Sequence, residues 1–153
     1  MVKIRGYKPG DMRHIAANIR PIDAKEAWCL TGKEPLEAIA ESIQRSDTIR
    51  IAEYNGEPVA IFGIGRKDLL SGEGIIWLVG TTNFKLMRKT FLQISKETIS
   101  FLLTFYPVAV NYVLAENKGT IKWLKWCGAE IGDSEPYGTG REMFRKLTLR
   151  RDA

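Results

Sequence analysis

Apolar residues recur along the chain at two spacings, one typical of helices and the other of strands. Between Pro35 and Gln44 they lie three or four positions apart, which predicts a helix with one buried stripe. Between Ile75 and Val79 they form a short unbroken run, which predicts a central strand covered on both faces. The predicted order is strand 2–5, helix 11–19, helix 23–30, helix 35–44, strands 48–54 and 58–65, strand 75–79, a long helix from 84, strand 108–114, helix 119–127, and closing strands 130–131 and 142–149.

The clearest local signal is a hairpin. Asn55-Gly56 separates two strand-like segments, 48–54 and 58–65, and this dipeptide favours the two-residue turn whose twist matches that of paired strands. These two strands are therefore expected to pair antiparallel.

The long helix is expected to begin at Phe84, to run for about six turns, and to end before Pro107. With the strands on either side of it, this helix forms a right-handed crossover. Its predicted buried stripe is Met87, Phe91, Ile94, Thr98, Phe101 and Phe105.

The next helix, 119–127, is expected to bury an apolar arc that includes Trp123 and Trp126, and Ser134 to Gly140 is expected to be turn-rich. Together these elements predict an α/β fold with a mixed central sheet of about six to seven strands flanked by helices. At 153 residues the chain is expected to form a single domain, 1–153.

Composition removes several classes of protein. Hydrophobic residues at 44% and charged residues at 27% argue against disorder, and no uncharged run approaches the ~20 residues of a membrane helix. We expect a cytoplasmic protein. The net charge of +5 is spread along the chain, so solubility explains it better than nucleic-acid binding does.

Isolated polar residues provide few candidates for a functional site. Cys29 and Cys127 belong to no metal-binding cluster and are expected to be buried, with no metal site. His14 lies off its helix's apolar stripe and is expected to be solvated, without a role. Asp23 and Glu26 lie three apart beside Arg20, where a structural salt bridge is expected.

The segment Val113 to Ala129, V-L-A-E-N-K-G-T-I-K-W-L-K-W-C-G-A, resembles the penultimate strand and helix of the GNAT superfamily of N-acetyltransferases. Asn117, Ile121 and Gly128 match that pattern at the right spacing, and the order of elements along nearly the whole chain is similar.

Within the superfamily, the sequence resembles a phage group of internal virion or morphogenesis proteins from short-tailed phages. The matching positions are Arg20, Asp23, Glu26, Phe62-Gly63, Trp77 to Thr81, Tyr106-Pro107, Asn111 to Val113, Asn117, Trp123 to Trp126, and Gly128.

The resemblance implies a GNAT-like fold that binds acetyl-CoA where strands 75–79 and 108–114 splay apart. The pantetheine arm would pair with exposed backbone like an added strand, and the pyrophosphate would sit on backbone N–H groups after Gly80. The implied donor-binding residues are Trp77, Leu78, Val79, Gly80, Thr81, Thr82, Lys85, Arg88 and Asn117.

Two readings of the cations beside that loop stay open. Lys85, Arg88 and Lys89 lie in what would be the first turn of a helix, where positive charge is mildly unfavourable. They either help to bind an anion or simply extend into solvent.

The chain also departs from the superfamily's pattern. Its loop T-T-N-F-K-L-M-R lacks the usual glycines, and Leu124 stands where many members carry a Tyr that protonates the departing thiolate. The apolar strand offers no base, so Glu73 just before it and Glu53 are the nearest carboxylates, and solvated surface is the competing explanation for both.

Two functions therefore compete. The first is an acyl-CoA-dependent N-acyltransferase that transfers acetyl to an unknown amine or protein acceptor, a host or phage molecule. The second is a non-catalytic GNAT-like protein that serves phage assembly or host interaction through phage or host protein partners, in the host cytoplasm or the virion. Nucleic acid is the least favoured partner.

Overall fold

A seven-stranded mixed sheet forms the centre of the molecule in the computed structural model, which describes residues 1–151. The strand order is β1-β2-β3-β4-β5-β7-β6, and all neighbours are antiparallel except β4 and β5, which are parallel. This confirms the predicted α/β fold with a mixed sheet. The strands are β1 (Val2–Arg5), β2 (Thr48–Tyr54), β3 (Glu57–Arg66), β4 (Glu73–Gly80), β5 (Val108–Leu114), β6 (Glu130–Tyr137) and β7 (Glu142–Arg150).

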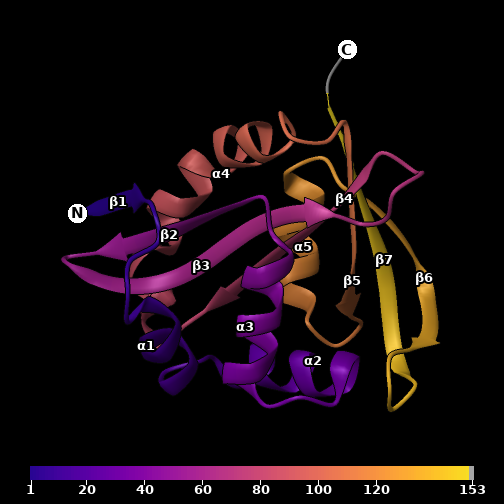
Figure 1. Cartoon of the computed structure of the whole chain (residues 1–153), viewed down its shortest axis with the longest axis horizontal. Helices are drawn as coiled ribbons and strands as arrows, with labels where there is room; N and C mark the ends of the chain where they lie inside the picture. Colours follow the sequence, from indigo (N-terminus) through magenta and orange to yellow (C-terminus); the bar gives the residue numbers. More distant parts are fainter. Residues whose placement is uncertain (152–153) are drawn as a thin grey trace.

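Helices cover both faces of the sheet (Figure 1). The buried residues of α1 and α3 pack against inward-facing side chains of β2, β3 and β4, and those of α2 pack against β5 and β7. The buried residues of α4 and α5 pack with strand residues to form the larger core on the other face. The helices are α1 (Asp11–Ala17), α2 (Pro21–Thr31), α3 (Pro35–Arg45), the 3-10 helix η1 (Thr82–Met87), α4 (Arg88–Leu102) and α5 (Lys118–Trp126).

The predicted hairpin is confirmed, because β2 and β3 pair across Asn55-Gly56. Both turn residues have positive φ, 50° at Asn55 and 84° at Gly56, as this turn requires. Local sequence alone fixed this element, since the turn chemistry and the period of the two flanking segments agree.

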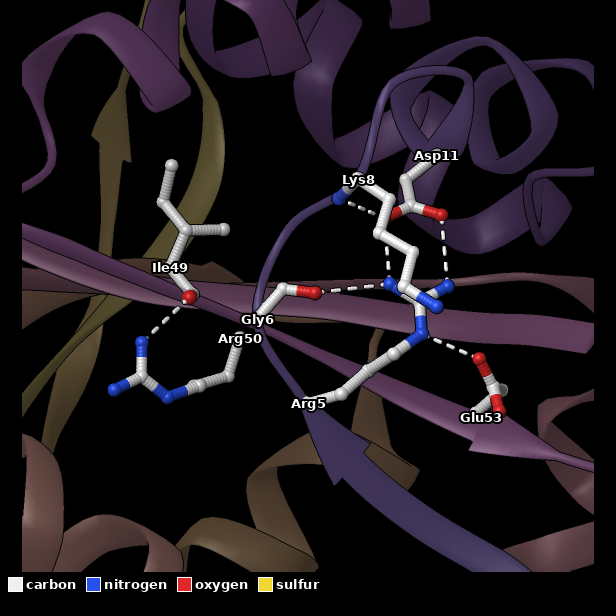
Figure 2. A network of polar contacts seen from close by, with 7 residues as sticks. All are labelled: Arg5, Gly6, Lys8, Asp11, Ile49, Arg50 and Glu53. Carbon is white, nitrogen blue, oxygen red and sulfur yellow. Dashed lines mark hydrogen bonds and ion pairs between the residues drawn. The ribbon is translucent and has the colours of Figure 1, made fainter.

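A polar network ties the N-terminal strand to the helix that follows it (Figure 2). The Arg5 guanidinium donates two hydrogen bonds to Asp11, at 2.8 and 2.9 Å, and also pairs with Glu53 on β2. Burial alone would raise the pKa of Asp11, but the bonds from Arg5 and from the Lys8 amide outweigh burial and hold that pKa below its usual value.

The predicted long helix was wrong at both ends. Residues 82–87 form the 3-10 helix η1, α4 begins at Arg88, and it ends at Leu102. The predicted stripe therefore drifts off the buried face in its second half, where Ser95, Ile99 and Leu102 are buried while Phe101 and Phe105 are exposed. The pattern of apolar residues does not reveal this buried face because Ser95 is polar. The Ser95 Oγ accepts a hydrogen bond from Trp123 Nε1 at 2.9 Å.

Two predictions for the C-terminal third also need correction. Ser134 to Tyr137 lie in β6, which pairs with β7 along an exposed edge, so only the segment after Tyr137 is a turn. On α5, Ile121 and Leu124 are buried but Trp126 is 49% exposed, because the groove beside it is open rather than filled by a neighbouring element.

Among the isolated residues singled out in the sequence, His14 and Cys127 differ from expectation. His14 is partly buried, and its Nε2 has no hydrogen-bond partner among the described residues, which corrects its expected solvation. Cys29 is buried and Cys127 partly buried, and burial raises the pKa of the Cys127 thiol to about 11. The described residues contain no group of three or more His, Cys, Asp or Glu side chains placed to hold a metal ion, and none of their helices is both long and apolar enough to cross a membrane.

Candidate functional site

The two parallel strands separate halfway along their length. β4 and β5 pair only from Glu73–Val108 to Ile75–Val110. Asn111 lies at the fork, where its Nδ2 donates to the Ile76 carbonyl at 2.6 Å and its Oδ1 accepts from the Tyr112 amide. The gap that opens beyond this residue is the predicted splay, present at the predicted place.

Backbone groups of β4 face this gap. The Ile76 carbonyl accepts from Asn111, and the Gly80 amide donates to Asp23 at 2.8 Å. Because every second residue of a strand points the same way, Leu78 presents its N–H and C=O to the same gap, where β5 no longer pairs. A peptide group in this position can pair with an extended ligand as an added strand would.

A cavity of about 830 Å³ passes through the gap and reaches both faces of the sheet. On one face it is bounded by α2 and α3, and on the other by α4 and α5. Its volume falls within the range of small-molecule sites, roughly 300 to 1,000 Å³.

Glu26 on α2 is the ionisable group best placed in this cavity. Its Oε2 accepts hydrogen bonds from the Leu114 amide at 2.8 Å and from Asn117 Nδ2 at 3.4 Å, while no described residue donates to Oε1. Burial raises the pKa of Glu26 to about 7, since lost hydration outweighs the bond from Leu114, and the nearby charge of Asp23 acts in the same direction. A carboxyl with this pKa can take up and release a proton near neutral pH.

Asp23, one turn earlier, is fully engaged. Arg20 donates to both of its oxygens, at 2.8 and 2.9 Å, and the Gly80 amide donates to Oδ2. This confirms the predicted salt bridge for Asp23, whereas Glu26 forms no pair with Arg20. The bridge fixes the end of β4 against α2 and leaves neither charge free for a ligand.

The backbone N–H groups of the loop after β4 are also hydrogen-bonded within the protein. The Thr81 amide donates to Val59, and the Thr82 amide donates to Asn18 at 2.9 Å. Thr81 caps η1, because its Oγ1 accepts from Asn83 and its carbonyl accepts from Phe84. An anion would therefore find no free N–H from Gly80 to Phe84.

The predicted donor-binding residues fall into two groups. Those brought together around the cavity are Trp77, Leu78, Val79, Arg88 and Asn117. The others lie outside the cavity lining; they are Gly80, Thr81, Thr82 and Lys85. The first group surrounds the gap. The second group lies at the end of β4 and in the segment directly after it.

The carboxylates considered as bases lie elsewhere. Glu73 pairs with Lys67 at 3.0 Å, beside Val108 at the closed end of the strand pair. Glu53 belongs to the Arg5 network, which lowers its pKa (Figure 2). Neither lines the cavity. Leu124 does line it and is buried, so no acid replaces the missing Tyr at that position.

The sequence pattern grouped Glu26 with Asp23 in a structural salt bridge to Arg20 and so did not reveal the position of Glu26 in the cavity. One signal could have separated it from Asp23. Glu26 falls on the apolar stripe of α2, four residues after Ile22 and three before Cys29. A carboxylate within such a stripe faces the buried side of its helix. Because Asp and Glu are almost never fully buried unless they are paired, this position calls for a specific partner.

Comparison with solved structures identifies the fold. An acetyltransferase of the GNAT family from Streptococcus pneumoniae superposes with a TM-score of 0.67 at 14% identity, covering 98% of this chain and 99% of its own. A presumed acetyltransferase of Salmonella typhimurium, solved with its cofactor acetyl-CoA, gives 0.73 at 13% identity, covering 100% and 95%. Spermidine N-acetyltransferase from Vibrio cholerae, solved with CoA and spermine, gives 0.67 at 11% identity, covering 98% and 95%.

The chain matches no protein-family model, and no curated protein is similar to it in sequence. At these identities the structural likeness establishes the fold, which is that of the GNAT N-acetyltransferases.

Proposed function

We propose that this protein is an acyl-CoA-dependent N-acyltransferase that transfers acetyl from acetyl-CoA to an amine, with Glu26 as the general base. The observation that carries the proposal is the Glu26 carboxyl, whose pKa is about 7 and whose Oε1 is free beside the gap between β4 and β5. An acyl acceptor must lose a proton before it can attack, and a carboxylate with this pKa is suited to remove it.

The chain's own residues would position the acyl donor. The Leu78 peptide group would pair with the amides of the donor's arm, and Asn111 would keep the strands apart at the fork. Trp77 and Val79 would border the acceptor face of the gap, and Leu124 the donor face. Two reactants held in this way react as if in one molecule, which lowers the barrier.

The ammonium of the acceptor gives one proton to Glu26 and becomes a neutral amine. Its nitrogen then attacks the thioester carbonyl carbon, a C–N bond forms, and the C–S bond breaks. The nitrogen's second proton reaches the departing thiolate, because Leu124 supplies none. The products are the amide and the thiol of CoA, and Glu26 returns its proton to solvent.

Phosphate binding would differ from the usual loop. The amides from Gly80 to Phe84 are engaged, so the cavity-lining cations Arg88 and Lys122 take over this task. Both are exposed and lie on the facing helices α4 and α5. Exposed charges contribute little each, so we expect weak, salt-sensitive affinity for the donor.

The test is a pair of measurements on the full chain. Calorimetric titration with acetyl-CoA reports donor binding, and release of the CoA thiol on adding a primary amine reports transfer. Saturable binding with amine-dependent thiol release would support the proposal. Binding that is absent at millimolar acetyl-CoA would contradict it.

A second function deserves the same test: a non-catalytic GNAT-like protein that acts through phage or host protein contacts. The engaged amides of the loop and the missing acid at Leu124 favour it. The resemblance to internal virion and morphogenesis proteins, and with it a place in the host cytoplasm or the virion, belongs to this candidate. Purification of the chain within intact virions, combined with no acetyl-CoA binding, would establish this function in place of the first.

A further inference from the structure

The acceptor side of the cavity has an apolar wall. It is formed where α2 and α3 face β4, on the side of the sheet away from α4. Side chains of this wall bury apolar surface of any ligand that enters. Representative members are Ile22, Ala27, Leu30, Ala38, Ile39 and Val79.

Three polar side chains of the wall already use their donors within the protein. Thr31 Oγ1 donates to the Ala27 carbonyl at 2.7 Å, and Ser42 Oγ donates to the Ala38 carbonyl at 3.1 Å. Trp77 Nε1 donates to Ser46 at 2.8 Å. Their donors are therefore not available to recognise a polar acceptor.

Among the described residues that line this side, Glu26 carries the one charge that is not paired within the protein. Arg20 and Asp23 neutralise each other through two hydrogen bonds, and the Gly80 amide takes a further lone pair of Asp23. Glu26 keeps Oε1 open to the cavity. The wall thus offers a single carboxylate within an apolar surface.

We propose that the acyl acceptor is a primary amine with one positive charge on an uncharged aliphatic or aromatic body. Its ammonium meets Glu26, and its body lies against the wall between α2 and α3. This inference rests on the proposed transferase function.

The same wall rejects other classes of amine. A second ammonium, as in a polyamine, would be buried against aliphatic side chains without a carboxylate to pair with. The carboxylate of an amino acid would meet only Arg20, which is already engaged by Asp23. Buried unpaired charges are costly enough to exclude both classes.

Three amines of equal chain length test this inference. They are hexylamine, hexamethylenediamine and aminocaproate, each measured with acetyl-CoA by thiol release. We expect kcat/KM for hexylamine to exceed that for either of the others by at least about 100-fold, because each of the others must bury a second charge.

A charge variant of the wall sharpens the result. Ala38→Glu places a second carboxylate in the wall and should raise the ratio of diamine to monoamine turnover by about tenfold or more, whereas the uncharged Ala38→Gln should not. Equal or faster turnover of the diamine or of aminocaproate by the native chain would overturn the acceptor class and leave the transferase function standing. Turnover of none of the three amines, with acetyl-CoA bound, would also overturn the acceptor class. Failure to bind acetyl-CoA would overturn both.

Discussion

The gap between β4 and β5 and the loop that follows β4 are neighbours in the chain but differ in their free hydrogen-bonding groups. In the gap, Leu78 faces open space where no strand pairs with it. In the loop, the amides from Gly80 to Phe84 all have partners within the protein. The resemblance to the acetyltransferases implies that the first region pairs with a donor's pantetheine arm and the second holds its pyrophosphate, and only the first still has free backbone groups for this task.

This difference separates what the fold provides from what the local sequence provides. The gap follows from sheet topology, since two parallel strands diverge once Asn111 occupies the fork. A phosphate-binding loop of the usual kind depends on glycines that allow a ligand to approach the backbone closely. The corresponding segment of this chain lacks them, and Thr81 caps η1 there instead. Donor recognition should therefore depend on the gap and on side chains, and little on the loop.

The largest expected effect is on catalysis. Glu26→Gln keeps an acceptor for the Leu114 amide but removes the base, so kcat/KM for amine acetylation should fall by about 10²–10⁴-fold. Loss of the rate's dependence on a group titrating near neutral pH should accompany this fall. Glu37→Gln makes the same change of charge at an exposed site on α3 and is the matched control. An unchanged rate for Glu26→Gln would remove Glu26 from the mechanism.

The same substitution should raise stability at alkaline pH. The pKa of Glu26 rises from 4.5 to about 7 on folding. This group therefore stabilises the native protein fully at pH values below its unfolded-state pKa, and the stabilisation is lost as the pH rises through about 7. Glu26→Gln should therefore be more stable than the native chain by about 2–3 kcal/mol at about pH 8, with the difference fading toward about pH 4. Urea unfolding at both pH values measures this, and a variant that is less stable at about pH 8 would show that the charged form is favoured.

The next largest expected effect is that of a backbone change on acetyl-CoA binding. Leu78→Pro removes the N–H that faces the gap without removing a bond to β3, and proline is tolerated at such open strand edges. We expect acetyl-CoA to bind about tenfold more weakly to it than to Leu78→Ala, which keeps the N–H and loses the side chain. Calorimetry on the two folded variants decides. Equal affinities would mean that the donor does not pair with β4.

The smallest expected effect is that of the cations. Arg88→Glu should weaken acetyl-CoA binding by about three- to tenfold at low salt, because Arg88 lines the cavity. Lys85→Glu should change it less, since Lys85 lies on η1 outside the cavity lining. The reverse order would place the phosphates on the loop.

Much of the fold could be predicted from sequence because it rests on short-range patterns. The Asn55-Gly56 turn, the apolar run of β4 and the α5 motif from Asn117 each carry their own signal. The errors arose where a tertiary contact overrides the pattern. Ser95 is a buried polar residue whose Oγ is bonded by Trp123 of α5, and η1, capped by Thr81, replaces the first turns of the expected helix.

The candidate site was only half predictable for the same reason. The residues of β4 and Asn117 could be located because they belong to continuous elements. Glu26 could not be, because its role depends on α2 placing it against the Leu114 amide, a contact 88 residues away in the chain. The engaged amides of the loop likewise depend on Asn18 and Val59, which the loop sequence does not reveal.

Amide chemical shifts during a titration with acetyl-CoA test the account most directly, since a 17.3 kDa chain suits ¹⁵N NMR. We predict that the Leu78 amide shifts strongly and becomes protected from hydrogen exchange, while the amides of Thr82, Asn83 and Phe84 change little. Strong shifts confined to Thr82, Asn83 and Phe84, or no shift at Leu78 at saturating acetyl-CoA, would contradict it.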